Sequence, residues 1–392
     1  MLRRNFISMN SKAGLLSVIG LRAVMIYGND GQLTSGQQQQ PEPLEKELRH
    51  LILPILKEKK IPGLSIAIVR NGRISWNEGF GVKDVVSNSP VNTETIFEIA
   101  SISKTVFAYS VMKLCEKGVM ALDTPLVKYA EQDFLENDAR LNMITARHVL
   151  SHQAGFQDWR SSQNPLRIGF TPGTGFDYSG EGYYFLQKIV TALTGKTDTG
   201  RCNDYEADLR VCATDIGDYL EKNVLKPHGM ISSGYVWRTH MGKNEAQAHG
   251  VDGKLITKPH QSATDLARYA SAGGLLSNAK DYANFMIGLF TPKENDPYRL
   301  NQQSLTEMVK PHVKLPENQK IDGADFWALG WAVQQRPGGN IILHSGGQAG
   351  FKSLAMVSLE KKNGFVMLTN SDNGGYLLHN ETMANILNRL FV

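Results

Sequence analysis

Residues 97–104 read Phe-Glu-Ile-Ala-Ser-Ile-Ser-Lys, and they set Ser101 three residues before Lys104. The apolar run before this pair predicts a strand or loop that enters a helix, on which residues three apart share one face. A serine hydroxyl is a poor nucleophile, and a lysine can take its proton when burial or nearby cations lower the lysine pKa. If Ser101 also starts the helix, its backbone N–H is an unpaired donor for an oxyanion. The stretch therefore predicts a nucleophile at Ser101.

The Ser-x-x-Lys spacing is short enough to recur by chance, and three further pairs show it: Ser110/Lys113, Ser277/Lys280 and Ser358/Lys361. We interpret the first pair as part of an amphipathic helix and Ser277 as the N-cap of the helix that follows it. Ser358 is expected to end a strand before a turn. The spacing alone does not identify which of the four pairs holds a nucleophile, so the surrounding sequence has to identify it.

The composition is that of a globular protein with a large core. The chain has 392 residues, of which 41% are hydrophobic and 20% charged, and its net charge is +4. That charge is too small to indicate a nucleic-acid partner, and no Lys/Arg run alternates with aromatic residues. No cysteine or histidine cluster has zinc spacing, and no phosphate loop is present, so we expect neither a metal nor a cofactor. The sequence does not indicate an oligomeric state.

The first 42 residues predict a leader followed by a linker. Residues 1–6 are basic, and residues 13–21 form an apolar run that is too short to span a bilayer. This pattern favours a secretory signal, hence a periplasmic or secreted protein without a membrane span once processed; a disordered or transit leader is the alternative. Residues 28–42, with their glutamine run, are typical of a low-complexity linker.

Three cysteines occur in the chain. Cys115 falls on the apolar face of the helix that follows Ser101, which indicates a buried free thiol. Cys202 and Cys212 bracket a polar segment, and they either form a local disulfide in an oxidising compartment or stay reduced.

The remaining pattern predicts one domain over residues 43–392. Helical periodicity predicts helices at 44–56, 104–118, 183–193, 279–289 and 379–390. Short apolar or alternating runs predict strands at 64–69, 73–79, 329–335, 341–344, 351–358 and 365–369. Short connections make the strands antiparallel. We therefore expect an α/β fold of the α+β type. Its antiparallel sheet comes from both chain ends, 43–95 and 325–392, and is flanked by helices, with a mostly helical lobe inserted at about 96–324.

The octet at 97–104 resembles the active-site signature of class C β-lactamases and of their serine DD-peptidase and family VIII esterase relatives. Ala100 departs from that signature, which usually has glycine. Further segments of the family follow in the family's order: 149–155, 172–179, 272–277, 329–331 and 344–347. The resemblance covers residues 44–392 and implies a β-lactamase/transpeptidase-like fold.

The resemblance also implies roles for residues of this chain. Ser101 would be the acylated nucleophile, Lys104 its proton partner and Tyr178 the second acid and base. A phenol serves as a base at neutral pH only if cations lower its pKa, and Lys104 with His344 would supply that field.

The segment His344-Ser345-Gly346 matches the third motif of the family, so Ser345 and Gly346 would bind substrate along a strand edge. The N–H groups of Ser101 and Gly347 would form the oxyanion hole.

Gly180 is the departure that bears on substrate. Penicillin-processing members usually have Tyr-x-Asn, where the asparagine amide binds the substrate, whereas this chain has Tyr178-Ser179-Gly180. We therefore expect a serine hydrolase that acts on a small-molecule or peptide acyl substrate. It would be an esterase or D-amino-acid peptidase, with weak β-lactamase activity at most. A true class C β-lactamase or DD-carboxypeptidase, and a non-enzymatic penicillin- or peptide-binding protein, are the alternatives.

Three other motifs are interpreted as structural. The literal Tyr-x-Asn at Tyr282–Asn284 falls within a predicted helix, and Ser371–Asn373 spells Ser-Asp-Asn at a predicted turn. His152 precedes a glycine turn and resembles a structural histidine of the family.

Overall fold

The computed structural model describes residues 43–130, 134–135, 137–194, 216–235, 241, 243–257 and 270–392. The predicted leader and the Cys202/Cys212 pair lie outside these residues, so both stay predictions. No helix in the described part of the chain is long and apolar enough to cross a membrane.

A nine-stranded antiparallel sheet has the order β3-β2-β1-β11-β10-β9-β8-β7-β6. Its strands are β1 (Gly63–Arg70), β2 (Arg73–Asp84), β3 (Ser89–Pro90), β6 (Val313–Lys314), β7 (Phe326–Trp327), β8 (Ala332–Gln334), β9 (Ile341–Gln348), β10 (Phe351–Ser358) and β11 (Asn363–Thr369). Strands β4 (Phe97–Glu98) and β5 (Leu276–Ser277) form a separate pair. The prediction of an antiparallel sheet built from both chain ends is confirmed.

The two chain ends meet along β1, which pairs with β2 on one side and with β11 on the other. Asn71 and Gly72 connect β1 to β2, and both have positive φ (51° and 73°), as a two-residue hairpin turn requires. Seven of the eight β1 residues are buried, because helices cover both faces of the sheet. This explains why β1 reads as a continuous apolar run rather than as an alternating one.

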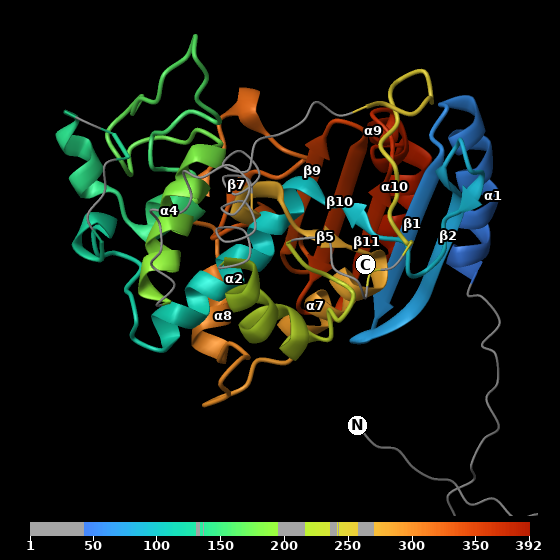
Figure 1. Cartoon of the computed structure of the whole chain (residues 1–392). Helices are drawn as coiled ribbons and strands as arrows, with labels where there is room; N and C mark the ends of the chain where they lie inside the picture. Colours follow the sequence, from blue (N-terminus) through green and yellow to red (C-terminus); the bar gives the residue numbers. More distant parts are fainter. Residues whose placement is uncertain are drawn as a thin grey trace, which may run out of the picture. The chain divides into compact units, whose positions relative to one another are not determined.

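One face of the sheet packs against α1 and the C-terminal helices, and the opposite face packs against α7 (Figure 1). Ile66 and Ile68 of β1 belong to the core shared with α1, whereas Ala67 and Val69 belong to the core shared with α7. The longer helices are α1 (Pro43–Glu58), α2 (Ser103–Glu116), α4 (Gly180–Leu193), α7 (Ala279–Leu289), α8 (Gln302–Val309) and α10 (Glu381–Asn388).

Short helical turns complete the described elements. They are η1 (Ala100–Ile102), η2 (Leu126–Lys128), η3 (Ala139–Met143), α3 (Ala146–Leu150), η5 (Glu221–Leu225), η6 (Lys226–His228), η8 (Glu317–Gln319), α9 (Gly374–Leu378) and η9 (Arg389–Phe391). Within the inserted region, α2, α4 and α8 gather at the left of Figure 1, away from α1.

Several boundaries differ from the predicted ones. Helix α4 begins at Gly180, three residues early, because the Ser179 hydroxyl caps it by accepting a bond from Gly182 N–H at 2.9 Å. The sheet continues through Pro90, which sits in the edge strand β3, where proline is tolerated. It also extends back to Val313, inside the region predicted to be helical, through the two-residue strands β6 and β7.

Candidate active site

Ser101 lies in the turn η1, directly before α2, and three hydrogen bonds hold its neighbours in place. Ser103 Oγ donates to Ala100 O at 2.6 Å and accepts from Leu275 N–H at 3.1 Å. Ser353 Oγ, from the central strand β10, donates to Ile99 O at 2.7 Å. The serine is therefore fixed between the sheet and the helical region, and its side chain stays partly exposed.

Lys104 lies one helical turn after Ser101 and is almost fully buried, with 2% of its surface exposed. Its Nζ is 3.3 Å from Ser101 Oγ and donates to Ala272 O at 2.6 Å. Burial lowers the pKa of Lys104 to about 7, although the Asp158 carboxylate opposes this shift. A large fraction of the Lys104 side chains is thus neutral near pH 7 and able to accept the Ser101 proton.

Tyr178 joins this pair, but its protonation differs from the prediction. Lys104 Nζ lies 4.9 Å from the centre of the Tyr178 ring. Burial raises the Tyr178 pKa, and a side-chain hydrogen bond with Ser101 only partly offsets that rise. The prediction that neighbouring cations lower the pKa of this phenol is therefore wrong. Tyr178 is a neutral O–H group that can pass a proton on.

His344 is also uncharged, so the prediction that it supplies a positive charge near Tyr178 is wrong as well. It is buried on β9, where desolvation and the nearby Lys104 lower its pKa to about 3. Its Nδ1 lies 2.6 Å from Ser345 O, and since a carbonyl only accepts, Nδ1 carries the proton. Nε2 is then a buried acceptor that has no hydrogen-bond partner among the described residues. His344 offers a lone pair to the site rather than a positive charge.

The β9 segment that follows His344 approaches the nucleophile closely. A Cβ atom added to Gly346 would lie 2.9 Å from Ser101 N and 2.3 Å from Ser353 Oγ. Only glycine fits there, which explains the glycine in the third motif. Strand β8 pairs with β9 only up to Leu343, so Ser345, Gly346 and Gly347 have β10 on one side and no described strand on the other.

Ala100, the departure from the family signature, has a φ of 50°. This left-handed conformation costs an L-residue roughly 1–2 kcal/mol, whereas glycine adopts it freely. The glycine usual at this position is thereby explained. In this chain the surrounding hydrogen bonds hold an alanine in the strained conformation directly before Ser101.

His152 supports Tyr178 from behind. Its Nδ1 accepts the Ser179 N–H at 3.1 Å, and its ring centre lies 4.3 Å from that of Tyr178. Burial and the nearby Lys104 and His344 lower the His152 pKa well below its usual value. This neutral, fully packed histidine agrees with the structural interpretation.

The other Ser-x-x-Lys pairs do not form sites. Ser110 donates within its helix to Phe107 O, and Ser358 Oγ accepts from the Lys361 backbone in a turn. Ser277 was predicted to be an N-cap, which is wrong: Asn278 caps α7 instead, through a bond from Asp281 N–H.

The two remaining motif matches are structural, as predicted. Tyr282 is fully buried, and its hydroxyl bonds to Thr105 Oγ1 at 2.8 Å. The turn at Ser371–Asn373 is closed by a bond from Asn373 N–H to Ser371 Oγ at 3.1 Å.

Gly180 lies against the aromatic ring of Trp159. A Cβ atom added there would lie 2.1 Å from Cζ2 and 2.3 Å from Cε2 of Trp159. The indole of Trp159 therefore occupies the space into which the side chain of an asparagine at position 180 would project. Nothing in the local sequence pattern around Trp159 indicates that its ring reaches Gly180.

The substitution Gly180→Ala is expected to lower the free energy of unfolding by about 1–3 kcal/mol, because even one methyl group overlaps the indole. Gly182→Ala, in the same helix, is the matched control. Its added Cβ would lie 3.5 Å from the nearest atom, Ser179 Oγ, so helix propensity predicts an unchanged or higher stability. Urea denaturation measures both. Equal effects of the two substitutions would contradict the predicted contact with Trp159.

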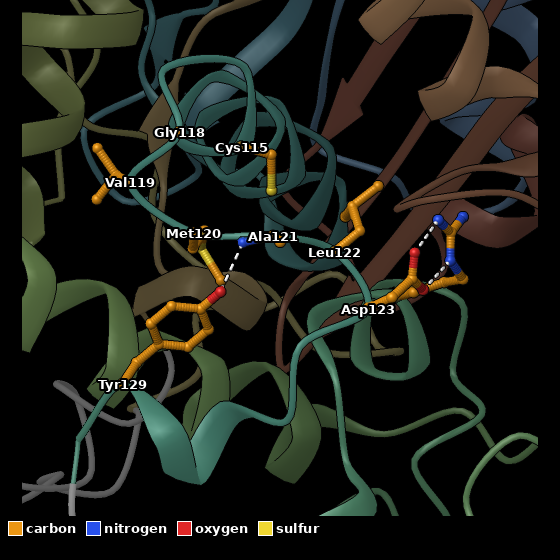
Figure 2. Close-up of a pocket in the computed structure, with 9 residues that line it drawn as sticks. Cys115, Gly118, Val119, Met120, Ala121, Leu122, Asp123 and Tyr129 are labelled. Atoms are coloured by element: carbon orange, nitrogen blue, oxygen red, sulfur yellow. Dashed lines mark hydrogen bonds and ion pairs between the residues drawn. The ribbon is translucent and has the colours of Figure 1, made fainter.

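A pocket of about 470 Å³ lies at the C-terminal end of α2, and Ser101 is not among the residues that line it. Figure 2 shows Cys115, Met120 and Tyr129 around it. Asp123, which also lines the pocket, accepts bonds from Arg147 Nε at 2.6 Å and Nη2 at 2.8 Å. Cys115 is a free thiol, as predicted, but it is only partly buried. Desolvation raises its pKa to about 12, which makes it a poor nucleophile.

No cluster of three or more potential metal ligands occurs in the described part of the chain.

A model of the Beta-lactamase family matches residues 48–387. The chain belongs to the Beta-lactamase family. Among curated members, Protein flp of Staphylococcus aureus strain N315 is 23% identical over 359 residues, which cover 86% of this chain and 64% of that protein. Unguisins hydrolase ungD' of Aspergillus campestris is 23% identical over 365 residues, covering 84% and 62%. This chain thus spans less than two thirds of the length of both relatives.

The fold of this Beta-lactamase family member is shared with solved structures. The Beta-Lactamase/D-Alanine Carboxypeptidase from Pseudomonas syringae superposes with a TM-score of 0.70 at 18% identity, over 89% of this chain and 99% of the other. The β-lactamase/transpeptidase-like fold that the sequence resemblance implied is confirmed.

Proposed function

We propose that the protein is a serine hydrolase that forms an acyl-enzyme at Ser101 and cleaves ester or amide bonds. One observation carries the proposal: Ser101 Oγ lies 3.3 Å from the Nζ of a buried lysine whose pKa is about 7. A nucleophile beside a base that is neutral at working pH is the arrangement that acyl transfer requires. Membership of the Beta-lactamase family and a relative named as a hydrolase support the same class of activity.

In the acylation step, neutral Lys104 takes the Ser101 proton while Oγ attacks the substrate carbonyl carbon. The N–H groups of Ser101 and Gly347 hold the oxyanion. Tyr178, a neutral phenol that is hydrogen-bonded to Ser101, relays the proton to the leaving oxygen or nitrogen. The bond between that leaving atom and the carbonyl carbon breaks at the same time.

In the deacylation step, water attacks the acyl carbon and gives its proton to the same Lys104–Tyr178 pair. The bond from carbon to Ser101 Oγ then breaks, and that proton returns to Oγ. The product is a carboxylic acid, and the enzyme is restored. His344 Nε2, a buried acceptor, helps to hold the Tyr178 hydroxyl or the water in place.

Within this class, ester or D-amino-acid peptide cleavage is favoured over strong β-lactamase activity. The asparagine amide that binds penicillin side chains is absent, and Trp159 fills its space. The fold shared with a β-lactamase/D-alanine carboxypeptidase keeps a true class C β-lactamase or DD-carboxypeptidase as the second candidate. Rapid nitrocefin turnover would favour that candidate.

A fluorophosphonate probe followed by peptide mass spectrometry tests the proposal. We expect one adduct, on Ser101, that forms faster as the pH rises through about 7. The folded Ser101→Ala protein should show no adduct and no hydrolysis of 4-nitrophenyl esters. Substrate binding without an adduct or turnover in the wild-type protein would instead identify a non-enzymatic binding protein.

A further inference from the structure

His152 holds the backbone on both sides of Tyr178. Its Nδ1 accepts the Ser179 N–H at 3.1 Å, and its backbone oxygen accepts the Asp177 N–H at 2.9 Å. The centre of its ring lies 4.3 Å from that of Tyr178, and the two ring planes are 35° apart. The residue before Tyr178, the residue after it and the phenol ring itself therefore all contact His152.

The hydrogen bond to Ser179 fixes the tautomer of His152. A backbone N–H only donates, so Nδ1 carries the lone pair and Nε2 carries the proton. Burial, together with the nearby Lys104 and His344, lowers the pKa of His152 well below its usual value, so the ring stays neutral. One ring nitrogen is thus occupied as an acceptor and the other is protonated. His152 has no free lone pair with which to take a proton from Ser101.

Filling the core is the simpler explanation for His152, because its ring also packs against Phe176 and Trp327. Packing alone would be served by phenylalanine, which needs no hydrogen-bond partner. The Nε2–H of His152 is buried without a partner among the described residues, and its φ of 56° is uncommon for a residue other than glycine. Both features are unfavourable for stability, and unfavourable local features of this kind cluster at functional sites.

We propose that His152 is a positioning residue whose Nδ1 holds the backbone of Tyr178 so that the phenol hydroxyl meets the leaving atom of the substrate. The inference rests on the proposed hydrolase function and deepens it. In the acylation step, the Ser101 proton reaches the leaving atom through Lys104 and Tyr178, while the bond from Ser101 Oγ to the carbonyl carbon forms. A displaced Tyr178 slows the protonation of the leaving atom. The attack itself, for which Lys104 is the base, changes little.

Two esters with the same acyl group, 4-nitrophenyl acetate and 4-nitrobenzyl acetate, separate these two effects. The 4-nitrophenoxide anion leaves without a proton, whereas the benzyl alkoxide needs one. The kcat/KM value reports the acylation step for both esters. For His152→Phe, which keeps a ring and loses the acceptor, we expect kcat/KM to fall about 30-fold or more for the benzyl ester and less than about threefold for the phenyl ester. Tyr178→Phe should show the same selectivity with a larger loss.

Two further substitutions of His152 separate the hydrogen bond from the packing of the ring. In His152→Asn the carboxamide oxygen takes the bonded position of Nδ1, and asparagine tolerates a positive φ. We expect its kcat/KM for the benzyl ester to stay within about fivefold of the wild-type value. His152→Leu has nearly the size of His152→Asn but no acceptor, so it should show the selective loss of His152→Phe.

His228→Phe is the control for a loss of stability without a loss of position. His228 is also buried, and its ring packs against Tyr109 and Phe285. The substitution is expected to lower the melting temperature but to change the ratio of the two kcat/KM values less than about twofold. Thermal melting of each variant checks that it is folded.

The outcomes separate the two proposals. Equal losses for the two esters in His152→Phe and His152→Leu, no loss in either variant, or an equally selective loss in His152→Asn overturns the positioning role and leaves the hydrolase function intact. A Tyr178→Phe protein without selectivity overturns the proton relay and the positioning role together, but not the nucleophile Ser101. Absence of Ser101-dependent hydrolysis of both esters in the folded wild-type protein overturns the hydrolase function as well.

Discussion

Replacing Ser101 by alanine is expected to lower kcat for ester hydrolysis by about 10⁴-fold or more, the range observed when a catalytic serine is removed. The physical reason is that no acyl-enzyme can form, whereas the binding surface on β9 is unchanged. Steady-state kinetics with a 4-nitrophenyl ester measures the loss. KM is expected to stay within a few-fold of the wild-type value wherever residual turnover allows it to be determined.

Ser110→Ala is the matched control for this loss. Ser110 has the same spacing to a lysine, lies in the same helix α2, and donates only to the backbone oxygen of Phe107. Its removal is expected to change kcat less than twofold. A similar loss in both variants would show that the effect comes from damage to α2 and not from the chemistry at Ser101.

Replacing Lys104 by methionine is expected to lower kcat by roughly 10²–10⁴-fold, the usual contribution of a general base. Methionine keeps the length and apolar character of the buried stem but accepts no proton. In the wild-type protein the rate should rise with pH through about 7, because the ammonium form that dominates below this pH cannot take the Ser101 proton. The variant should lack this rise. Lys280→Met, at an exposed lysine paired with Glu94, is the control and should retain it.

Stability offers an independent measurement on the same lysine. Lys104 has a pKa of about 7 in the folded protein and 10.5 as an unperturbed group. The unfolded chain therefore binds more protons between these two pH values, so Lys104 makes the free energy of unfolding rise with pH from about 7 to about 10.5, by a few kcal/mol. Lys104→Met should lose this contribution and be more stable than wild type at pH 7. A Lys104→Met protein that unfolds more easily at pH 7 would contradict the lowered pKa.

Local spacing and motif order were sufficient to predict much of the site. Ser101 and Lys104 lie within one helical turn, so their meeting follows from helix geometry, and Tyr178 and His344 were found from the family's order of motifs. Their protonation was not predictable from the pattern. The neutral state of His344 and the raised pKa of Tyr178 result from burial, which depends on how the sheet and the inserted helices close over these side chains.

Asp158 and Trp159 show a different limit of sequence reasoning. Their place at the N-terminus of α4 depends on the ion pair between Arg160 of the loop and Glu181 of the helix, which are 21 residues apart in the sequence and have no recognisable spacing. Strand β6 was missed for a simpler reason, since two residues are too few to show alternation.

The pairing of β1 with β11 has a consequence for how the protein is made. Leu64 faces Thr369 across this ladder, so the hairpin of β1 and β2 waits during synthesis for a strand that lies about 300 residues later in the chain. Until β11 arrives, one edge of β1 stays unpaired, and β9 has not been delivered to Ser101. A product truncated before β9 would still contain Ser101 and Lys104, yet it would lack Gly346 and Gly347 and expose an open strand edge prone to aggregation. Synthesis through β11 is therefore needed both to close the sheet and to assemble the proposed site.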